Sequence, residues 1–65
     1  MNLKSLVDII SGISSLYIND RKDLYFDLSI KAYELKLNEN YKDLLQREID
    51  NMFINENYEM VIWLK

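Results

Sequence analysis

The chain has 65 residues, neither histidine nor cysteine, and a formal net charge of −3 at pH 7. These features exclude a disulfide scaffold and the usual transition-metal sites. They also disfavour nucleic acid as a ligand, because binding to phosphates relies on lysine and arginine. A fold of this size buries only about 60% of the surface that its unfolded chain exposes. We therefore expect one small domain that gains stability from a partner protein or by forming a homo-oligomer.

An apolar stripe runs through the N-terminal segment, residues 1–19. Its apolar positions fall on one wide arc at the spacing of an α-helix, opposite Lys4 and Asp8, which predicts an amphipathic helix. Gly12 lies on the polar side and favours the close approach of another backbone. No apolar run reaches the roughly 18 residues of a membrane span, and no signal-peptide cleavage site follows. We expect a cytoplasmic protein without a membrane span.

The middle of the chain predicts a helical hairpin over residues 21–54. Residues 21–37 carry two apolar stripes at helical spacing, as in a helix that touches two neighbours. Asn38 is suited to cap a second helix, whose single apolar stripe starts at Tyr41 and continues to about residue 54. Because the connection is only a few residues long, the two helices are expected to lie antiparallel.

The C-terminal segment, residues 55–65, is compatible with a short strand, a helical turn or an extended tail. We expect a helical turn, because one short strand has no obvious partner in a helical chain. The predicted fold class is all-α: a single domain that forms a small three-helix bundle, built on the antiparallel helical hairpin and followed by this short segment.

The residue types for catalysis are not assembled in any recognisable pattern. A catalytic site requires a nucleophile beside a base, or paired carboxylates in a pocket. The serines of the first segment have no histidine, and the carboxylates alternate with lysines as on a solvated face. No phosphate-binding glycine loop and no metal-binding motif is present. We expect a binding protein that is not an enzyme and that uses no cofactor and no metal.

A family pattern covers residues 23–52 without a gap. The positions that follow it are Leu24, Asp27, Lys31, Ala32, Glu34, Leu35, Leu37, Asn38, Tyr41, Leu44, Glu48 and Ile49. Through this pattern the segment resembles the Sda family, small inhibitors of sporulation histidine kinases in low-GC Gram-positive bacteria. The chain departs from the pattern at Asp50, Asn51 and Met52, where the family has a basic cluster, and in the segment before residue 23, which the family lacks.

The resemblance implies a helical hairpin that binds the helical dimerisation and phosphotransfer domain of a sensor histidine kinase and blocks phosphoryl transfer. In the family, residues at the hairpin turn contact the partner, which corresponds to Leu37 and Tyr41 here. From the residues alone, these two side chains either anchor in the groove of a helical partner or plug the hairpin's own end. The partner-binding residues that we predict are Tyr33, Leu37, Asn38, Tyr41 and Leu44.

A second hypothesis comes from a different class of protein. The amphipathic N-terminal helix is also suited to the core of a homo-oligomer, as in a self-associating structural or adaptor module of phage origin. In that case the protein would inhibit nothing.

Overall fold

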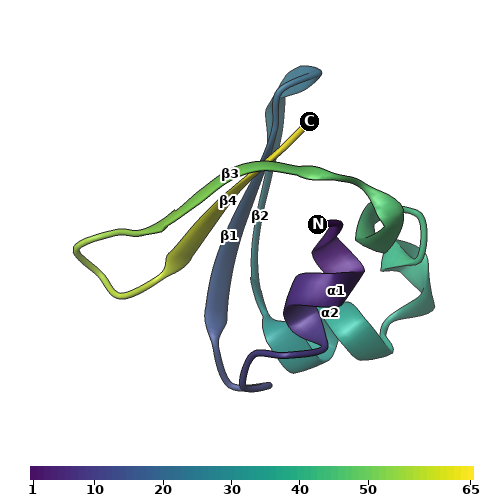
Figure 1. Cartoon of the computed structure of the whole chain (residues 1–65), viewed down its shortest axis with the longest axis vertical. Helices are drawn as coiled ribbons and strands as arrows, with labels where there is room; N and C mark the ends of the chain where they lie inside the picture. Colours follow the sequence, from purple (N-terminus) through teal and green to yellow (C-terminus); the bar gives the residue numbers. More distant parts are fainter.

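The computed structural model describes residues 1–65 and contains a four-stranded mixed sheet with two short helices on one face (Figure 1). The elements in chain order are α1 (Leu3–Val7), β1 (Ser15–Asp20), β2 (Asp23–Lys31), α2 (Ala32–Leu37), the 3-10 turns η1 (Glu39–Tyr41) and η2 (Leu44–Gln46), β3 (Ile49–Ile54) and β4 (Met60–Leu64). The predicted all-α fold, with its helical hairpin and three-helix bundle, is therefore wrong.

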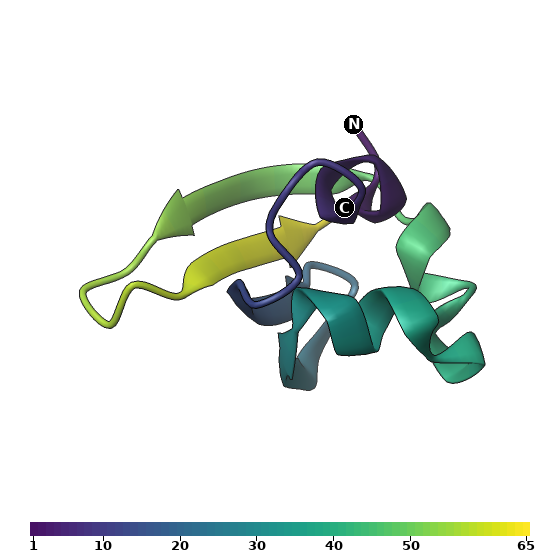
Figure 2. The same cartoon turned by 90° about the horizontal axis from the view of Figure 1, so that it is seen from below.

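The sheet has the strand order β2-β1-β4-β3, so β1 and β4 form the centre and β2 and β3 the edges. The central pair is parallel, whereas each edge strand runs antiparallel to its neighbour. Ile18 shows the register, because it lies opposite Leu28 of β2 and opposite Ile62 of β4. The hairpin of β3 and β4 extends away from the helices, as both views show (Figures 1 and 2).

The core lies between the sheet and the helices. In β1, buried residues alternate with half-buried ones, as expected for a strand with one covered face. The α1 helix begins after Asn2, whose Oδ1 accepts a hydrogen bond from the Ser5 N–H at 2.9 Å. The largest fully buried side chains are Leu3, Leu16, Ile18, Leu35, Ile62 and Leu64.

The N-terminal helix predicted over residues 1–19 is confined to Leu3–Val7, and the last part of that segment is the strand β1. The apolar residues of the segment 1–19 are dense enough to fit one arc of a helix. Leu16 and Ile18 are nevertheless buried because they lie at alternate positions of a strand, on its covered face. The predicted close approach at Gly12 is confirmed. The Tyr33 N–H donates to the Gly12 carbonyl at 2.9 Å, and a Cβ on Gly12 would lie 3.3 Å from Tyr33 Cβ.

The first helix of the predicted hairpin is mostly strand. Phe26, Leu28 and Ile30 are half-buried and alternate with exposed Asp27 and Ser29, which is the period of a strand with one covered face. On a helical projection this alternation gives two stripes, which is why it resembled a helix with two neighbours. Only its end, α2, is helical.

The second predicted helix and the C-terminal turn are also wrong. The segment after Asn38 forms two 3-10 turns and then β3, while residues 60–64 form the central strand β4. The strand lacked a partner in the sequence prediction only because β1 and β3 were taken as helices. Neither helix is long and apolar enough to cross a lipid bilayer, in agreement with the expected lack of a membrane-spanning helix.

Candidate interaction site

The β3 strand leaves part of its backbone open at the edge of the sheet. At the hairpin end, the Asn55 N–H donates to the Glu59 carbonyl at 3.0 Å. Hydrogen-bonded and non-bonded pairs alternate along an antiparallel ladder. Counted back from Asn55, the backbone of Phe53 forms hydrogen bonds to β4, whereas the backbones of Met52 and Ile54 do not. The N–H and C=O groups of Met52 and Ile54 therefore point away from the sheet.

The side chains along this open edge are apolar. Met52 is 43% exposed, Phe53 49% and Ile54 57%, and no charged residue interrupts them. Proteins usually protect an edge strand with lysine, proline, inward-pointing charges or a covering element. Here a bulge between Ile49 and Asn51 disturbs only the start of the strand. We call the segment Met52–Ile54 the β3 edge.

The opposite edge of the sheet is protected over residues 27–31, where β2 pairs regularly with β1. The Ala32 N–H donates to the Ser14 carbonyl at 3.0 Å, so by the same alternation Asp27 and Ser29 carry the open backbone groups of β2. Asp27 is itself charged and exposed, and exposed Lys31 follows at the end of the strand. These polar and charged side chains oppose the addition of another strand. The two edges thus differ in their capacity to accept a further strand.

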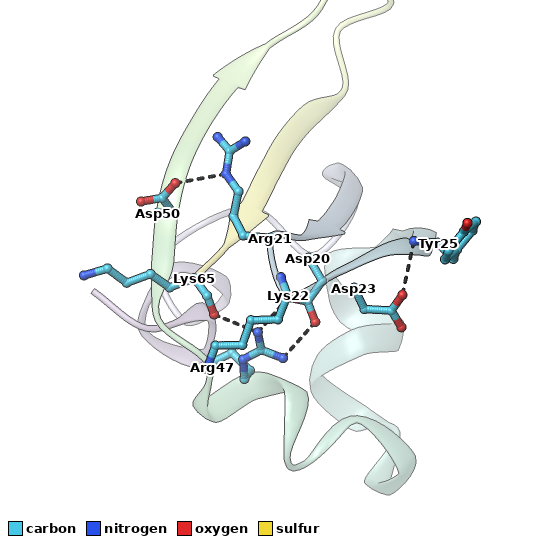
Figure 3. Close-up of polar contacts among 8 residues, drawn as sticks. All are labelled: Asp20, Arg21, Lys22, Asp23, Tyr25, Arg47, Asp50 and Lys65. Atoms are coloured by element: carbon cyan, nitrogen blue, oxygen red, sulfur yellow. Dashed lines mark hydrogen bonds and ion pairs between the residues drawn. The ribbon is translucent and has the colours of Figure 1, made fainter.

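An ion pair fixes the start of β3 to the centre of the sheet (Figure 3). The Arg47 guanidinium donates to both carboxylate oxygens of Asp20 at 2.8 and 3.0 Å, and to the Lys65 carbonyl at 2.7 Å. The hydrogen bonds from Arg47, together with one from the Lys22 N–H, hold the pKa of the Asp20 carboxyl below its ordinary value. The same region is tied by the Lys65 N–H, which donates to the Glu48 carbonyl at 2.9 Å.

A second contact joins the β1–β2 turn to the base of the β3–β4 hairpin. The Arg21 guanidinium lies 4.4 Å from the centre of the Trp63 ring. Along β4, Trp63 lies between the fully buried Ile62 and Leu64, so its side chain points to the face of the sheet without helices. Its Nε donates to Asp50 Oδ2 at 3.0 Å (Figure 3). A cation over an aromatic face is attracted by the ring quadrupole. Arg21 therefore orients the hairpin from the side opposite to Arg47.

The far end of the hairpin is closed by the side chain of Asn55. Its Oδ1 accepts hydrogen bonds from the N–H groups of Asn57 at 2.9 Å and Glu59 at 3.0 Å. Tyr58 has a positive φ of 61°, a conformation that is uncommon for a residue other than glycine. The β3 edge is thus held at both ends by polar contacts, although its own side chains are exposed.

The predicted partner-binding residues do not form one surface. Tyr33 and Leu37 lie on α2, are 49% and 77% exposed, and line a shallow hollow beside the end of α1. Asn38 is a cap, as predicted, but of η1, where its side chain accepts from the Asn40 N–H. Tyr41 and Leu44 are half-buried and pack against the core. Their binding role stays a prediction.

The β3 edge was missed by the sequence prediction. The run Met52–Phe53–Ile54 has the β-propensity of a strand and no charge, but it was assigned to the end of a helix. The signal that would have found it is the pair of neighbouring apolar runs, 52–54 and 60–64, separated by an asparagine-rich turn.

The structure brings one serine and one lysine together. Lys31 Nζ donates to Ser15 Oγ at 2.6 Å, in an open hollow also lined by Ser29, Glu34 and Glu59. An ammonium that donates to the serine does not act as its base, so this contact does not activate a nucleophile. No three acidic side chains lie close enough together to hold a metal ion. That the chain is not an enzyme stays a prediction.

Comparisons with known protein families, with curated proteins and with solved structures find no match to this chain. The resemblance to the Sda family therefore stays a prediction. The helical hairpin through which an Sda-like protein would act is not present in the structure.

Proposed function

We propose that this chain is a small regulatory binding protein without catalytic activity, which takes up an extended segment of a partner protein as an additional strand beside β3. The observation that carries the proposal is the β3 edge, with its open backbone groups and three exposed apolar side chains. Strand addition is a common mode of peptide recognition, in which main-chain hydrogen bonds give affinity and alternate side chains give specificity.

The chemistry of the β3 edge defines the segment that it would accept. Met52 and Ile54 project on the helix side of the sheet and Phe53 on the other side, because alternate residues of a strand point to opposite faces. A bound strand would thus meet apolar side chains on both faces. Since Asp50 and Glu56 flank the edge and the chain carries a net charge of −3, basic residues at the ends of the segment are favoured.

This proposal replaces the helical docking that the sequence predicted. A regulatory role by binding is kept, whereas the helical hairpin as the docking element is not. The exposed pair Tyr33 and Leu37 on α2 remains a second candidate surface, supported by its exposure beside a hollow. A kinase as the partner and the cytoplasm as the compartment stay predictions from the sequence.

The proposal is tested with a displayed library of random ten-residue peptides, followed by affinity measurements on the peptides recovered. Met52→Pro is the informative variant, because it removes an N–H that points out of the sheet and is not used within the chain. We expect the variant to keep its circular dichroism spectrum and melting temperature, and to bind the recovered peptides at least about tenfold more weakly, as for one lost main-chain hydrogen bond.

Two variants serve as controls for this experiment. Phe53→Pro removes an N–H that forms a hydrogen bond to β4, so it should lower the melting temperature of the free protein. Met52→Ala shortens the side chain and keeps the N–H, so it separates side-chain contacts from backbone pairing. A library that yields no binder, or peptides that bind Met52→Pro as tightly as the unmodified protein, would contradict strand addition.

A further inference from the structure

We infer that the β3 edge pairs with the β3 edge of a second copy of this chain when no partner is bound, in an antiparallel arrangement with its twofold axis at Phe53. This inference rests on the proposed function, because the same edge must be able to accept a strand. In the free protein a second copy of the chain would occupy the β3 edge, and a partner segment would have to compete with it.

The positions of the open backbone groups are self-complementary. Those of Met52 and Ile54 lie one residue to each side of Phe53. A twofold axis at Phe53 therefore places Met52 of one copy opposite Ile54 of the other. Each such pair can exchange both of its hydrogen bonds, as the bonded pairs of an antiparallel ladder do. The two four-stranded sheets would join into one continuous sheet.

The side chains are matched in the same register. Phe53 lies opposite Phe53 of the second copy in a non-bonded pair, where the Cα atoms are only about 4.5 Å apart and side chains are close. On the other face, Met52 lies opposite Ile54 of the second copy. Aromatic and apolar cross-strand pairs stabilise a sheet. The apolar side chains that are 43–57% exposed in the single chain are thus the ones that pairing covers.

A shift of the axis by one position destroys this match. With the axis at Met52, Ile54 would lie opposite Asp50 and Phe53 opposite Asn51 of the second copy. With the axis at Ile54, Met52 would lie opposite Glu56 and Phe53 opposite Asn55. Apolar side chains would face polar ones in both cases, and with the axis at Met52 the pairing would also reach the irregular part of β3 between Ile49 and Asn51. The register centred on Phe53 is therefore the favoured one.

Charge and size make this dimer weak. In the favoured register Asp50 faces Glu56 of the second copy, although Arg21 compensates part of the Asp50 charge. Each copy also carries a net charge of −3. One pair of edge strands buries less than the roughly 1,200 Å² at the lower end of standard interfaces. We expect an association that depends on protein concentration, strengthens with added salt, and yields to a tightly bound partner segment.

Single-cysteine variants test the register, since the chain contains no cysteine of its own. Phe53→Cys should form a disulfide-linked dimer under mild oxidation, because the two copies bring this position together across the axis. Asn51→Cys is the matched control on the same face of the same strand. In the favoured register it lies opposite Asn55 of the second copy, so it should cross-link much more slowly. The readout is the fraction of dimer by mass spectrometry without reductant.

Sedimentation of the unmodified protein over a range of concentrations gives an independent readout. We expect reversible dimerisation that is abolished in Phe53→Lys, which places like charges on the axis, and in Met52→Pro. A monomer at the highest accessible concentration, or faster cross-linking of Asn51→Cys than of Phe53→Cys, would overturn the inference. Peptides that bind the β3 edge of a strictly monomeric protein would leave the proposed function intact, whereas a dimer in the stated register that binds no peptide would reject the proposed function alone.

Discussion

Asp20 is the charged side chain of the core, at 8% exposure, and its bidentate partner Arg47 also holds the end of β4. We expect Asp20→Asn to lower the free energy of unfolding by about 1–3 kcal/mol, because the substitution leaves Arg47 without its charged acceptor. Urea unfolding followed by circular dichroism measures this change. Asp50→Asn is the matched control: its pair with Arg21 is solvent-exposed, so its loss should cost about 1 kcal/mol or less.

The same carboxylate gives the fold a pH dependence. Since hydrogen bonds from Arg47 and from the Lys22 N–H lower the pKa of Asp20 in the folded chain, the unfolded chain takes up the proton first as the pH falls. The contribution of Asp20 is therefore complete above its ordinary pKa of 3.8 and is lost as the pH falls below that value. Unfolding free energies measured from pH 6 downward should fall less steeply in Asp20→Asn than in the unmodified chain. Equal slopes would show that the pair does not set the acid stability.

At the level of elements, local chemistry was predictable and pairing was not. Asn38 was identified as a cap and Gly12 as a point of close approach, and both depend on contacts that a sequence pattern can suggest. The strands depend on partners far along the chain: β1 pairs with β4 across more than 40 residues. Apolar residues dense enough to satisfy a period of two also satisfy a period near 3.6, so spacing alone did not separate strand from helix.

The β3 edge could not be predicted from local spacing either. Exposure of Met52, Phe53 and Ile54 follows from their place on an edge strand, and an edge is a property of the whole sheet. The sequence prediction placed residues 52–54 at the end of a helix, as part of an apolar stripe that packs inside a helical bundle. Of the residues that were predicted to bind a partner, Tyr33 and Leu37 are exposed, while Tyr41 and Leu44 pack against the core. Their distribution follows from the two 3-10 turns η1 and η2, which stand where the sequence predicted a continuous second helix.

The orientation of α2 provides a test of the element itself. Leu35 is fully buried, whereas Leu37, two residues later, is 77% exposed. We expect Leu35→Ala to lower the free energy of unfolding by about 2–5 kcal/mol, as for other large-to-small substitutions in a core. Leu37→Ala should stay within about 0.5 kcal/mol of the unmodified protein. Chemical unfolding of the two variants under the same conditions compares them directly, and a cost at Leu37 as large as that at Leu35 would contradict the placement of α2.

For the molecule as a whole, the N-terminal segment connects the core to the candidate site. Leu3, Leu6 and Val7 are at most 4% exposed, and α1 packs against η2 and α2. The backbone at the chain start also pairs with the beginning of β3. The Ile49 N–H donates to the Met1 carbonyl at 2.9 Å, and the Leu3 N–H donates to the Arg47 carbonyl at 2.9 Å. The segment thus covers one side of the core and supports the strand that carries the β3 edge.

We therefore expect deletion of residues 1–7 to unfold the whole domain. Burial of a large apolar side chain contributes about 1.5–3 kcal/mol. The loss of three of them is therefore comparable to the total stability of a domain of 65 residues, at roughly 0.05–0.15 kcal/mol per residue. The double variant Ile9→Ser with Ile13→Ser is the control, because these isoleucines are 73% and 77% exposed in the loop that follows α1. Circular dichroism and amide hydrogen exchange should show a disordered chain after the deletion and a native one in the control. A folded, cooperative domain without residues 1–7 would mean that the sheet and α2 form a sufficient core on their own, and that pairing with β4 and the contacts of Arg21 and Arg47 hold the start of β3 without the chain start.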